Sequence, residues 1–370
     1  MTTVRERITP LSATLALTSI AVLASVLIAC PAQTPDRRLE VIEGIAETPI
    51  DSSLGRALVD AGALHEASVA LCAAPSSASL DAAQDAWWTL RGPWKTFMAL
   101  PLGPVVDDGF DSAIDFWPAR PNSVEGGIDS GASSQAEIDA LGVASKGLPA
   151  IEYLLWGLEG DDAGVLSSLE GDTGERRCDY IRALAADLEV RFTALESAQD
   201  SFSAQLVGAG DNARYPSVAL AIDELLNAAI AGLHNTSERA LGKPLGVSAG
   251  ADPQPNSLES RFSTRSRQDT LDALAGFRLF YLGADAGGVG PGFTVLVSEP
   301  SAEIDAAVRT QLSAAIAALE ALPEPLLASD PPGPASEPAW NAVRELRLTL
   351  TADVAGLLGV TVSLTDNDGD

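Results

Sequence analysis

Histidine is almost absent from this chain: His65 and His234 are the only two among 370 residues. This scarcity excludes a zinc site built from three histidines. Residues 65–69 begin like the zinc-protease motif HExxH, but Val69 stands where the second histidine is required. The sequence also lacks a Walker loop for phosphates. Zinc hydrolysis through HExxH and P-loop nucleotide chemistry are therefore excluded.

Basic side chains are scarce as well, with 23 Lys and Arg against 51 Asp and Glu and a formal net charge of −28. Removal of residues 1–29 as a leader would leave 21 basic and 50 acidic side chains, a charge of −29. Such a charge repels nucleic acid and anionic lipid headgroups, and it attracts cations or cationic partners. We therefore expect no nucleic-acid partner.

Only one apolar run, Leu11–Ala29, approaches the length of a membrane span, and it leads into the segment LIAC that ends at Cys30. Small residues before a cysteine are typical of a bacterial lipobox. The pattern predicts a lipoprotein signal peptide at residues 1–29, lipidation of Cys30 and a lipid-anchored tether over residues 30–50. Pro31 stands where an Asp would favour the inner membrane, so we expect a cell-envelope protein in the outer membrane that faces the periplasm. A retained signal anchor is the alternative.

Besides Cys30, the only cysteines are Cys72 and Cys178. In an exported chain an even pair predicts a disulfide. A metal or catalytic thiol is the weaker interpretation, because neither cysteine has a second Cys or a His at ligand spacing.

Strand-like alternation is nearly missing, and apolar residues recur instead at helical spacing. The sequence predicts an all-α protein of two helical bundles, with an N-terminal bundle at residues 51–207 and a C-terminal bundle at residues 208–370. The segments FRLFYLG (277–283) and IEYLLWG (151–157) resemble each other, which a duplicated bundle would explain.

The candidate site centres on Glu152, which falls inside the apolar arc of a short predicted helix at residues 147–156. A carboxylate in that place has to be paired. On the helix before it, Trp87, Arg91 and Trp94 share one face, so the guanidinium of Arg91 lies between two indoles and is our candidate partner for Glu152. Two other interpretations remain: a buried structural ion pair, and an arginine that only covers aromatic packing.

Several ordered segments resemble the imelysin-like proteins, also known as the insulin-cleaving peptidase family. They are W-x-x-x-R-x-x-W (87–94), LGP (102–104), FWP (116–118), KG (146–147) followed by AIEYLL (150–155), E-x-x-F-S (259–263) and the terminal DGD (368–370). The resemblance implies two helical bundles that arose by duplication, export to the periplasm or outer membrane, a pocket between the bundles and an association with bacterial iron uptake. Peptidase members carry G-x-H-x-x-E, in which His and Glu are proposed to hold a metal. Here Gly147 and Glu152 are kept but Pro149 replaces the His, as in the branch that lacks it, so the resemblance implies neither metal binding nor proteolysis.

We therefore expect a non-catalytic lipoprotein that binds a small ligand or an iron-transport protein in the cleft between the bundles. The sequence identifies no particular cofactor, and iron or another divalent cation is the candidate ion. The alternatives are a metallopeptidase whose metal is held by carboxylates such as Glu152 and Glu259, and a structural lipoprotein in which Arg91 and Glu152 lock the core. The predicted ligand-binding residues are Trp87, Arg91, Trp94, Trp117, Arg120, Lys146, Glu152 and Glu259.

Overall fold

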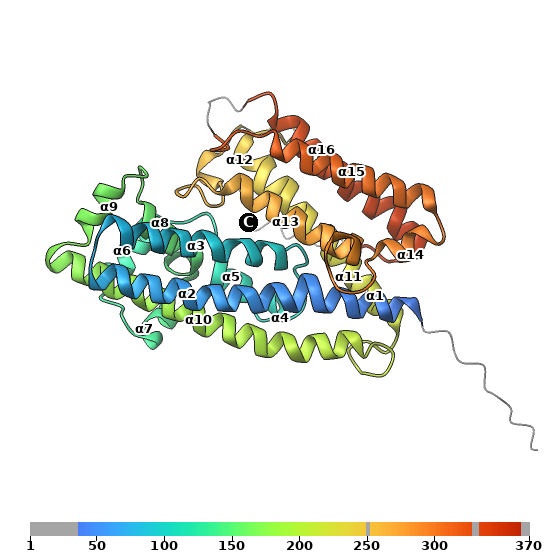
Figure 1. Ribbon diagram of the computed structural model, residues 1–370, viewed down its shortest axis with the longest axis horizontal. Coiled ribbons are helices and arrows are strands. Elements are labelled where there is room, and N and C mark those ends of the chain that lie inside the picture. Colours follow the sequence, from blue (N-terminus) through green and yellow to red (C-terminus); the bar gives the residue numbers. More distant parts are fainter. Residues whose placement is uncertain (1–35, 249–251, 328–332, 364–370) are drawn as a thin grey trace, which may run out of the picture. The chain divides into compact units, whose positions relative to one another are not determined.

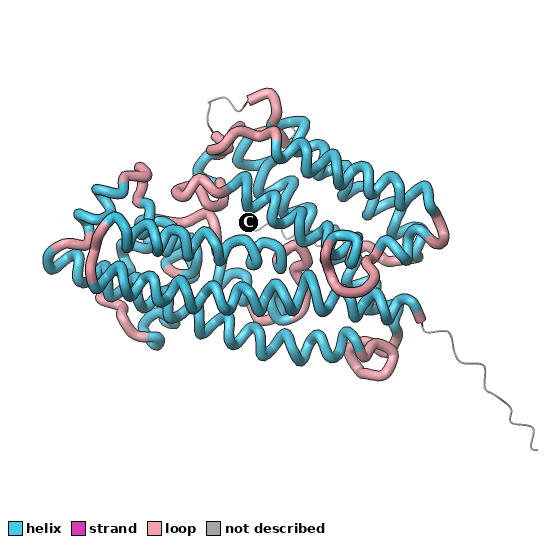
Figure 2. Tube along the Cα trace, in the orientation of Figure 1, coloured by secondary structure: helices cyan, strands magenta, loops and turns pink. Residues whose placement is uncertain are grey.

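The computed structural model describes residues 36–248, 252–327 and 333–363, and helices make up most of this part of the chain (Figure 1). Figure 2 shows helices joined by loops, and the described residues form no strand. The expectation of an all-α protein is confirmed. The predicted signal peptide, Cys30 and the terminal DGD lie outside the described residues.

Three long helices build the N-terminal half: α2 (Ser53–Ala73), α3 (Ser77–Phe97) and α10 (Gly171–Val207). Helix α2 packs against both of the others. The short turn between α2 and α3 makes them antiparallel, and the Ser76 side chain caps α3 by accepting a hydrogen bond from the Ser79 N–H (3.2 Å).

Short helices connect α3 to α10 and pack on the long helices of this half. Among them, α5 and α8 deliver the side chains of the candidate site. The connecting helices are α4 (Pro104–Asp107), α5 (Phe110–Asp115), α6 (Pro121–Asp129), α7 (Gln135–Ala140), the 3₁₀ turn Val143–Ser145, α8 (Gly147–Trp156) and α9 (Asp162–Ser168).

The C-terminal half is built on four longer helices. Helix α15 packs on α16 and α13, and α11 packs on α13 and α16 (Figure 1). The four are α11 (Val218–His234), α13 (Ser266–Leu282), α15 (Ala302–Glu320) and α16 (Ser336–Thr349). Shorter segments complete this half: the π-helical turns Asn235–Gly242 and Leu350–Val354, the 3₁₀ turns Pro255–Ser257 and Ala284–Ala286, α12 (Lys243–Leu245), α14 (Thr294–Ser298) and α17 (Ala355–Leu358).

The expected tether over residues 30–50 is wrong for its second half. Helix α1 (Arg37–Ile45) and a π-helical turn (Ala46–Ser52) occupy this stretch, and Ile42 and Ile50 are fully buried. Helix α1 packs against α10 and also against α11 and α14 of the other half. Ile42, Ala46 and Ile50 recur at a spacing of four, a helical signal that the prediction of a tether did not use, and helix α1 finds its partners far along the chain.

From Asp36 onward the described chain forms one compact unit with a continuous core of buried apolar residues. The predicted division into two bundles at residues 207/208 stays a prediction. We use it to name an N-terminal and a C-terminal half of this one unit. The halves meet where α3 packs on α13. Gly276 of α13 and Gly232 of α11 allow this approach, because a Cβ on either would clash with the carbonyl oxygen of Thr96 or Ala99, respectively.

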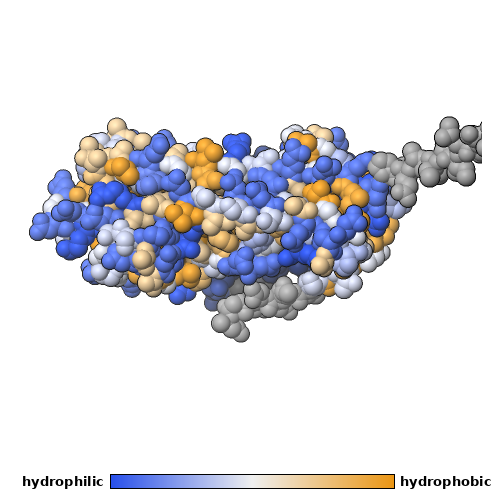
Figure 3. All heavy atoms as spheres, turned by 90° about the horizontal axis from the view of Figure 1, so that it is seen from below, coloured by the Kyte–Doolittle hydropathy of each residue, from blue (hydrophilic) through white to orange (hydrophobic). Residues whose placement is uncertain are grey.

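The surface is mainly hydrophilic on the face seen in Figure 3, where hydrophobic residues gather only in small separate groups. No large apolar patch covers that face. Within the described part of the chain, no helix combines the length and the apolar character that crossing a membrane requires.

We predict that Gly276→Ala destabilises the protein by about 2 kcal/mol, because the added methyl overpacks the contact between α3 and α13. The control is Gly126→Ala in α6, where a Cβ would meet no atom within 4 Å. This control should be neutral or stabilising by up to about 1 kcal/mol. Urea unfolding of both variants measures the difference, and equal effects would show that the halves are not closely packed at Gly276.

Candidate functional site

A buried guanidinium lies where the two halves meet. Arg91 of α3, whose side chain is 1% exposed, donates to Asp115 at the end of α5 (2.7 Å), to Glu259 (2.6 Å) and to Asp269 of α13 (2.8 Å). Glu259 and Asp269 come from the C-terminal half, some 170 residues away in sequence. One side chain thus ties α3 to both α5 and the other half.

Two further cations extend this arrangement. Lys95, one turn after Arg91, reaches Glu259 (2.8 Å), and Arg265 pairs with Asp269 and with Asp272 (2.8 Å). Each of these ion pairs is at least partly withdrawn from water, which strengthens the attraction and makes the loss of any one partner costly. We refer to these residues as the Arg91 network: Arg91, Lys95, Arg265, Asp115, Glu259, Asp269 and Asp272.

Tryptophans flank the Arg91 network on the α3 side. The Trp87 ring lies 5.5 Å from the Arg91 guanidinium carbon, and its indole N–H donates to the Leu148 carbonyl (2.9 Å). The Trp94 indole N–H donates to Asp115 (2.8 Å). Both rings are about 1% exposed or less, so they are walls of a closed core and not of an open cleft.

Glu152 of α8 does not pair with Arg91, so that expectation is wrong. Its Oε1 accepts hydrogen bonds from the backbone N–H groups of Phe262 (3.0 Å) and Ser263 (2.8 Å) and from the Ser263 hydroxyl (2.7 Å). The carboxyl is 1% exposed. The loop before α13 supplies all three donors, and nothing in the local sequence around Glu152 shows that this loop comes near.

The loop that binds Glu152 has an unusual backbone. Ser260 and Thr264 both have positive φ angles, of 48° and 61°. This region is costly for residues other than glycine and persists only where the surroundings hold it. The Ser260 hydroxyl donates to Asp269, so the Arg91 network fixes the loop on one side while Glu152 holds it on the other.

Burial and charge shift the acid–base behaviour of the site in opposite directions. Burial raises the pKa of Glu152 to about 7, although the hydrogen bonds from Ser263 partly oppose this shift. Burial also acts to raise the pKa of Asp269, but attraction by Arg91, Arg265 and Lys95 outweighs it and holds that pKa below its usual range. Asp269 therefore stays ionised at neutral pH, while Glu152 titrates there.

Comparison with known proteins identifies the family to which the chain belongs. The family model described as imelysin matches residues 52–350. The chain belongs to the imelysin family.

One curated relative of this imelysin-family protein and one similar solved structure are described as iron-regulated proteins. The chain is 25% identical over 295 residues to "Iron-regulated protein A" of Synechococcus elongatus, which covers 78% of this chain and 76% of the relative. A solved structure described as an iron-regulated protein A precursor, from Parabacteroides distasonis, has a TM-score of 0.74 at 18% identity and covers 89% of this chain and 96% of its own. An imelysin-like protein from Psychrobacter arcticus has a TM-score of 0.71 at 17% identity, with 88% and 97% covered. These structures establish the shared fold.

The metal that the peptidase motif implies does not fit the residues present. Pro149 has no ligand atom, and the Oε1 of Glu152 already accepts three hydrogen bonds in a closed core. The described residues contain no group of three or more His, Cys, Asp or Glu side chains that could hold a metal ion. No catalytic step through a metal at Glu152 can be derived for this imelysin-family chain.

A serine-hydrolase spacing, G-x-S-x-G, does occur in the sequence at residues 246–250. It follows the helix Lys243–Leu245, whereas a nucleophile elbow requires a preceding strand. Ser248 donates a hydrogen bond to Glu238 (3.3 Å), so its hydroxyl pairs with a carboxylate. The spacing is not a nucleophile elbow in this fold.

Three of the predicted ligand-binding residues lie apart from the Arg91 network. Lys146 is buried and donates to the carbonyls of Ile138 and Asp139, 3.1 and 3.2 Å away, at the end of α7. Arg120 is exposed and stacks on the Phe116 ring. The Trp117 ring stacks with Arg239 at 5.1 Å, and so contacts the C-terminal half. The predicted set is therefore not one cleft.

The sequence analysis missed five members of the Arg91 network: Asp115, Lys95, Asp272, Asp269 and Arg265. The signal for the last two was present, because Arg265, Asp269 and Asp272 repeat at spacings of four and three on α13, beside the apolar positions Ala273 and Phe277. Opposite charges at that spacing on an inward face indicate a buried ion pair. No such signal exists for Asp115.

The predicted disulfide between Cys72 and Cys178 is present. It joins the last turn of α2 to the first turns of α10, 106 residues along the chain. A bond across such a distance restricts the unfolded chain and so stabilises the N-terminal half.

We predict that Arg91→Met lowers the free energy of unfolding by about 4 kcal/mol, because buried carboxylates lose their shared cation. The control is Arg37→Met, which removes a charge whose side chain is 52% exposed and should cost less than about 1 kcal/mol. Urea unfolding compares them. A loss below 1 kcal/mol for Arg91→Met would mean that the Arg91 network does not hold the halves together.

A second prediction follows from Glu152. Its pKa is raised in the folded protein from an ordinary value of 4.5 to about 7, so its contribution to stability is fully present below pH 4.5 and is lost as pH rises to 7. Relative to Glu152→Gln, the wild type should lose about 3 kcal/mol of stability between pH 4.5 and pH 7.5. Urea unfolding at a series of pH values measures this difference. Parallel pH profiles of the two proteins would show that Glu152 is ionised throughout.

Proposed function

We propose that this protein is a non-catalytic, lipid-anchored member of the imelysin family that faces the periplasm and serves iron acquisition by binding a ligand or a partner protein. The family match and the iron-regulated relative support the iron-related role. The lipobox at Cys30 supports the anchor. A mature chain that begins before Cys30, or that carries no lipid, would contradict that part of the proposal.

The non-catalytic role rests on the residues at positions 149 and 152, where the peptidase motif would place its histidine and glutamate. Pro149 stands where the resemblance to the peptidases would place the histidine, and Oε1 of Glu152 accepts three hydrogen bonds from the loop before α13. A peptidase needs a water or metal at such a carboxylate and a path for a peptide to reach it. Here Glu152 acts as the acceptor that anchors a strained loop.

The same observations change the role of the predicted cleft residues. Arg91, Trp87, Trp94, Glu152 and Glu259 are all buried, and their polar groups hydrogen-bond within the protein. We infer that they lock the two halves together, as the structural alternative proposed. The ligand or partner then binds at residues outside the Arg91 network.

Thermal unfolding of the soluble form, from Asp36 onward, can be measured in the presence of ferrous iron, ferric iron, other divalent ions, haem and small peptides. We expect only the true ligand to raise the melting temperature. A ligand at about a hundred times its dissociation constant stabilises by about 2.7 kcal/mol. A higher melting temperature with iron or haem supports the proposal. If no compound changes the melting temperature, a partner protein becomes the expected ligand. Chelator-sensitive hydrolysis of the peptides would overturn the non-catalytic role.

A further inference from the structure

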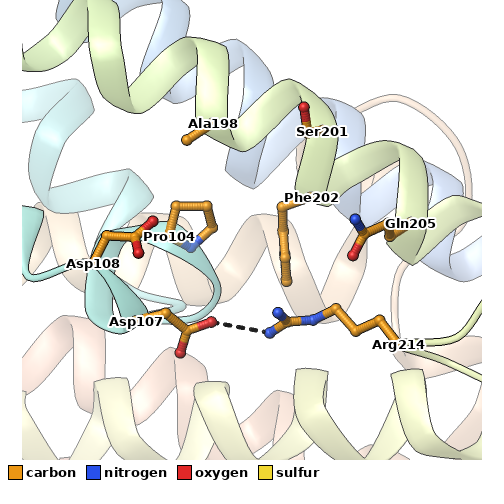
Figure 4. Close-up of a pocket in the computed structure, with 8 residues that line it drawn as sticks. All are labelled: Pro104, Asp107, Asp108, Ala198, Ser201, Phe202, Gln205 and Arg214. Atoms are coloured by element: carbon orange, nitrogen blue, oxygen red, sulfur yellow. Dashed lines mark hydrogen bonds and ion pairs between the residues drawn. The ribbon is translucent and has the colours of Figure 1, made fainter.

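An open pocket of about 340 Å³ lies in the N-terminal half, between α4 and the last turns of α10. Figure 4 shows residues that line it: Pro104 and Asp107 from α4, Asp108 just after it, Ala198 and Phe202 from α10, and Arg214 from the loop that follows α10. No residue of the Arg91 network lines it. Its volume is within the range of small-molecule sites.

The floor of this pocket is apolar and fixed in place. Phe202 is 3% exposed, and its ring lies beside Pro104 and below Ala198 (Figure 4). Gly103 has a φ of 66°, and a Cβ there would come within 2.8 Å of the Phe202 ring. Only glycine therefore permits α4 to start so close to this ring.

The cation of the pocket is already neutralised. Arg214 donates to Asp107 (3.2 Å) and to Glu224 of α11 (3.0 Å), and its Nε donates to the Tyr215 hydroxyl (3.2 Å). Its guanidinium also lies 4.8 Å from the centre of the Phe202 ring. These contacts fix Arg214 at the side of the pocket, and its positive charge is paired with the carboxylates of Asp107 and Glu224.

The carboxylates at the mouth are not neutralised in return. Within the described residues, Asp108 is exposed and has no hydrogen bond or ion pair from its side chain, and Asp107 is paired through Oδ2 only. With Glu224 they make three negative charges around the single positive charge of Arg214. The net charge of −28 adds to the negative potential here.

The geometry points to this pocket as a binding site for a small organic cation, an ammonium group on a short apolar body. The ammonium would lie between Asp108 and the unpaired oxygen of Asp107, and the apolar part would cover Phe202, Pro104 and Ala198. An anion would meet the excess of carboxylates, and an uncharged ligand would gain only the apolar floor. This site is independent of the iron-related role.

Three probes with one skeleton test the charge preference: 2-phenylethylammonium, 3-phenylpropionate and 3-phenylpropan-1-ol. Titration calorimetry on the mature protein, with the full chain after residue 29, should show binding of the ammonium compound and at least tenfold weaker binding of the other two, as expected for about 1.4 kcal/mol of charge preference. Equal binding of the propionate, or no binding of the ammonium compound up to about 10 mM, would overturn the proposal.

Variants locate the site. Asp108→Asn should weaken binding of 2-phenylethylammonium about fivefold, the effect of one partly exposed ion pair. Asp129→Asn, an exposed acid outside the pocket with the same loss of charge, should leave binding unchanged. Ala198→Phe fills the pocket and should abolish binding with little change in melting temperature. Equal effects of the two asparagine variants, or unchanged binding in Ala198→Phe, would place the cation elsewhere and refute the site.

Discussion

The guanidinium of Arg91, enclosed by Asp115, Glu259 and Asp269, is the interaction on which the arrangement of the two halves depends. A buried cation has no alternative to protein acceptors, and buried carboxylates have no alternative to protein cations. Because two of these acceptors come from the C-terminal half, the charges are satisfied only when α3 and α13 pack together. Gly276 makes that packing sterically feasible, and Gly232 of α11 allows a similarly close approach to Ala99 just after α3, so backbone shape and charge act in the same direction.

Glu152 of α8 is a second buried contact between the two halves of the molecule. Pro149, on the same helix, offers no ligand atom beside this glutamate, and the loop before α13 donates two backbone hydrogen bonds to its Oε1. A hydroxyl, that of Ser263, donates a third hydrogen bond to the same oxygen. The positive φ angles of Ser260 and Thr264 show that the backbone of this loop is strained in the conformation that places those donors.

Much of the fold could be predicted from the sequence, and less of the site. The apolar periods of α2, α3, α13 and α15 are long enough to be visible in the sequence, and the pair of cysteines predicted the disulfide. The inward positions of Arg91 and Glu152 were also visible, because helical spacing fixes which side chains share a face. Their partners were not, since Glu259, Asp269 and Ser263 lie more than 100 residues away along the chain.

The helical class, the excess of negative charge and the pairing of Cys72 with Cys178 could all be predicted from the amino-acid sequence. These properties depend on composition, local period or the chemistry of a single side chain. Three features became apparent only in the folded protein: residues 37–50 belong to the core, Arg91 and Glu152 bind different partners, and Lys146 lies apart from both. Each of these outcomes depends on which distant segment approaches, and that is set by packing of the whole chain.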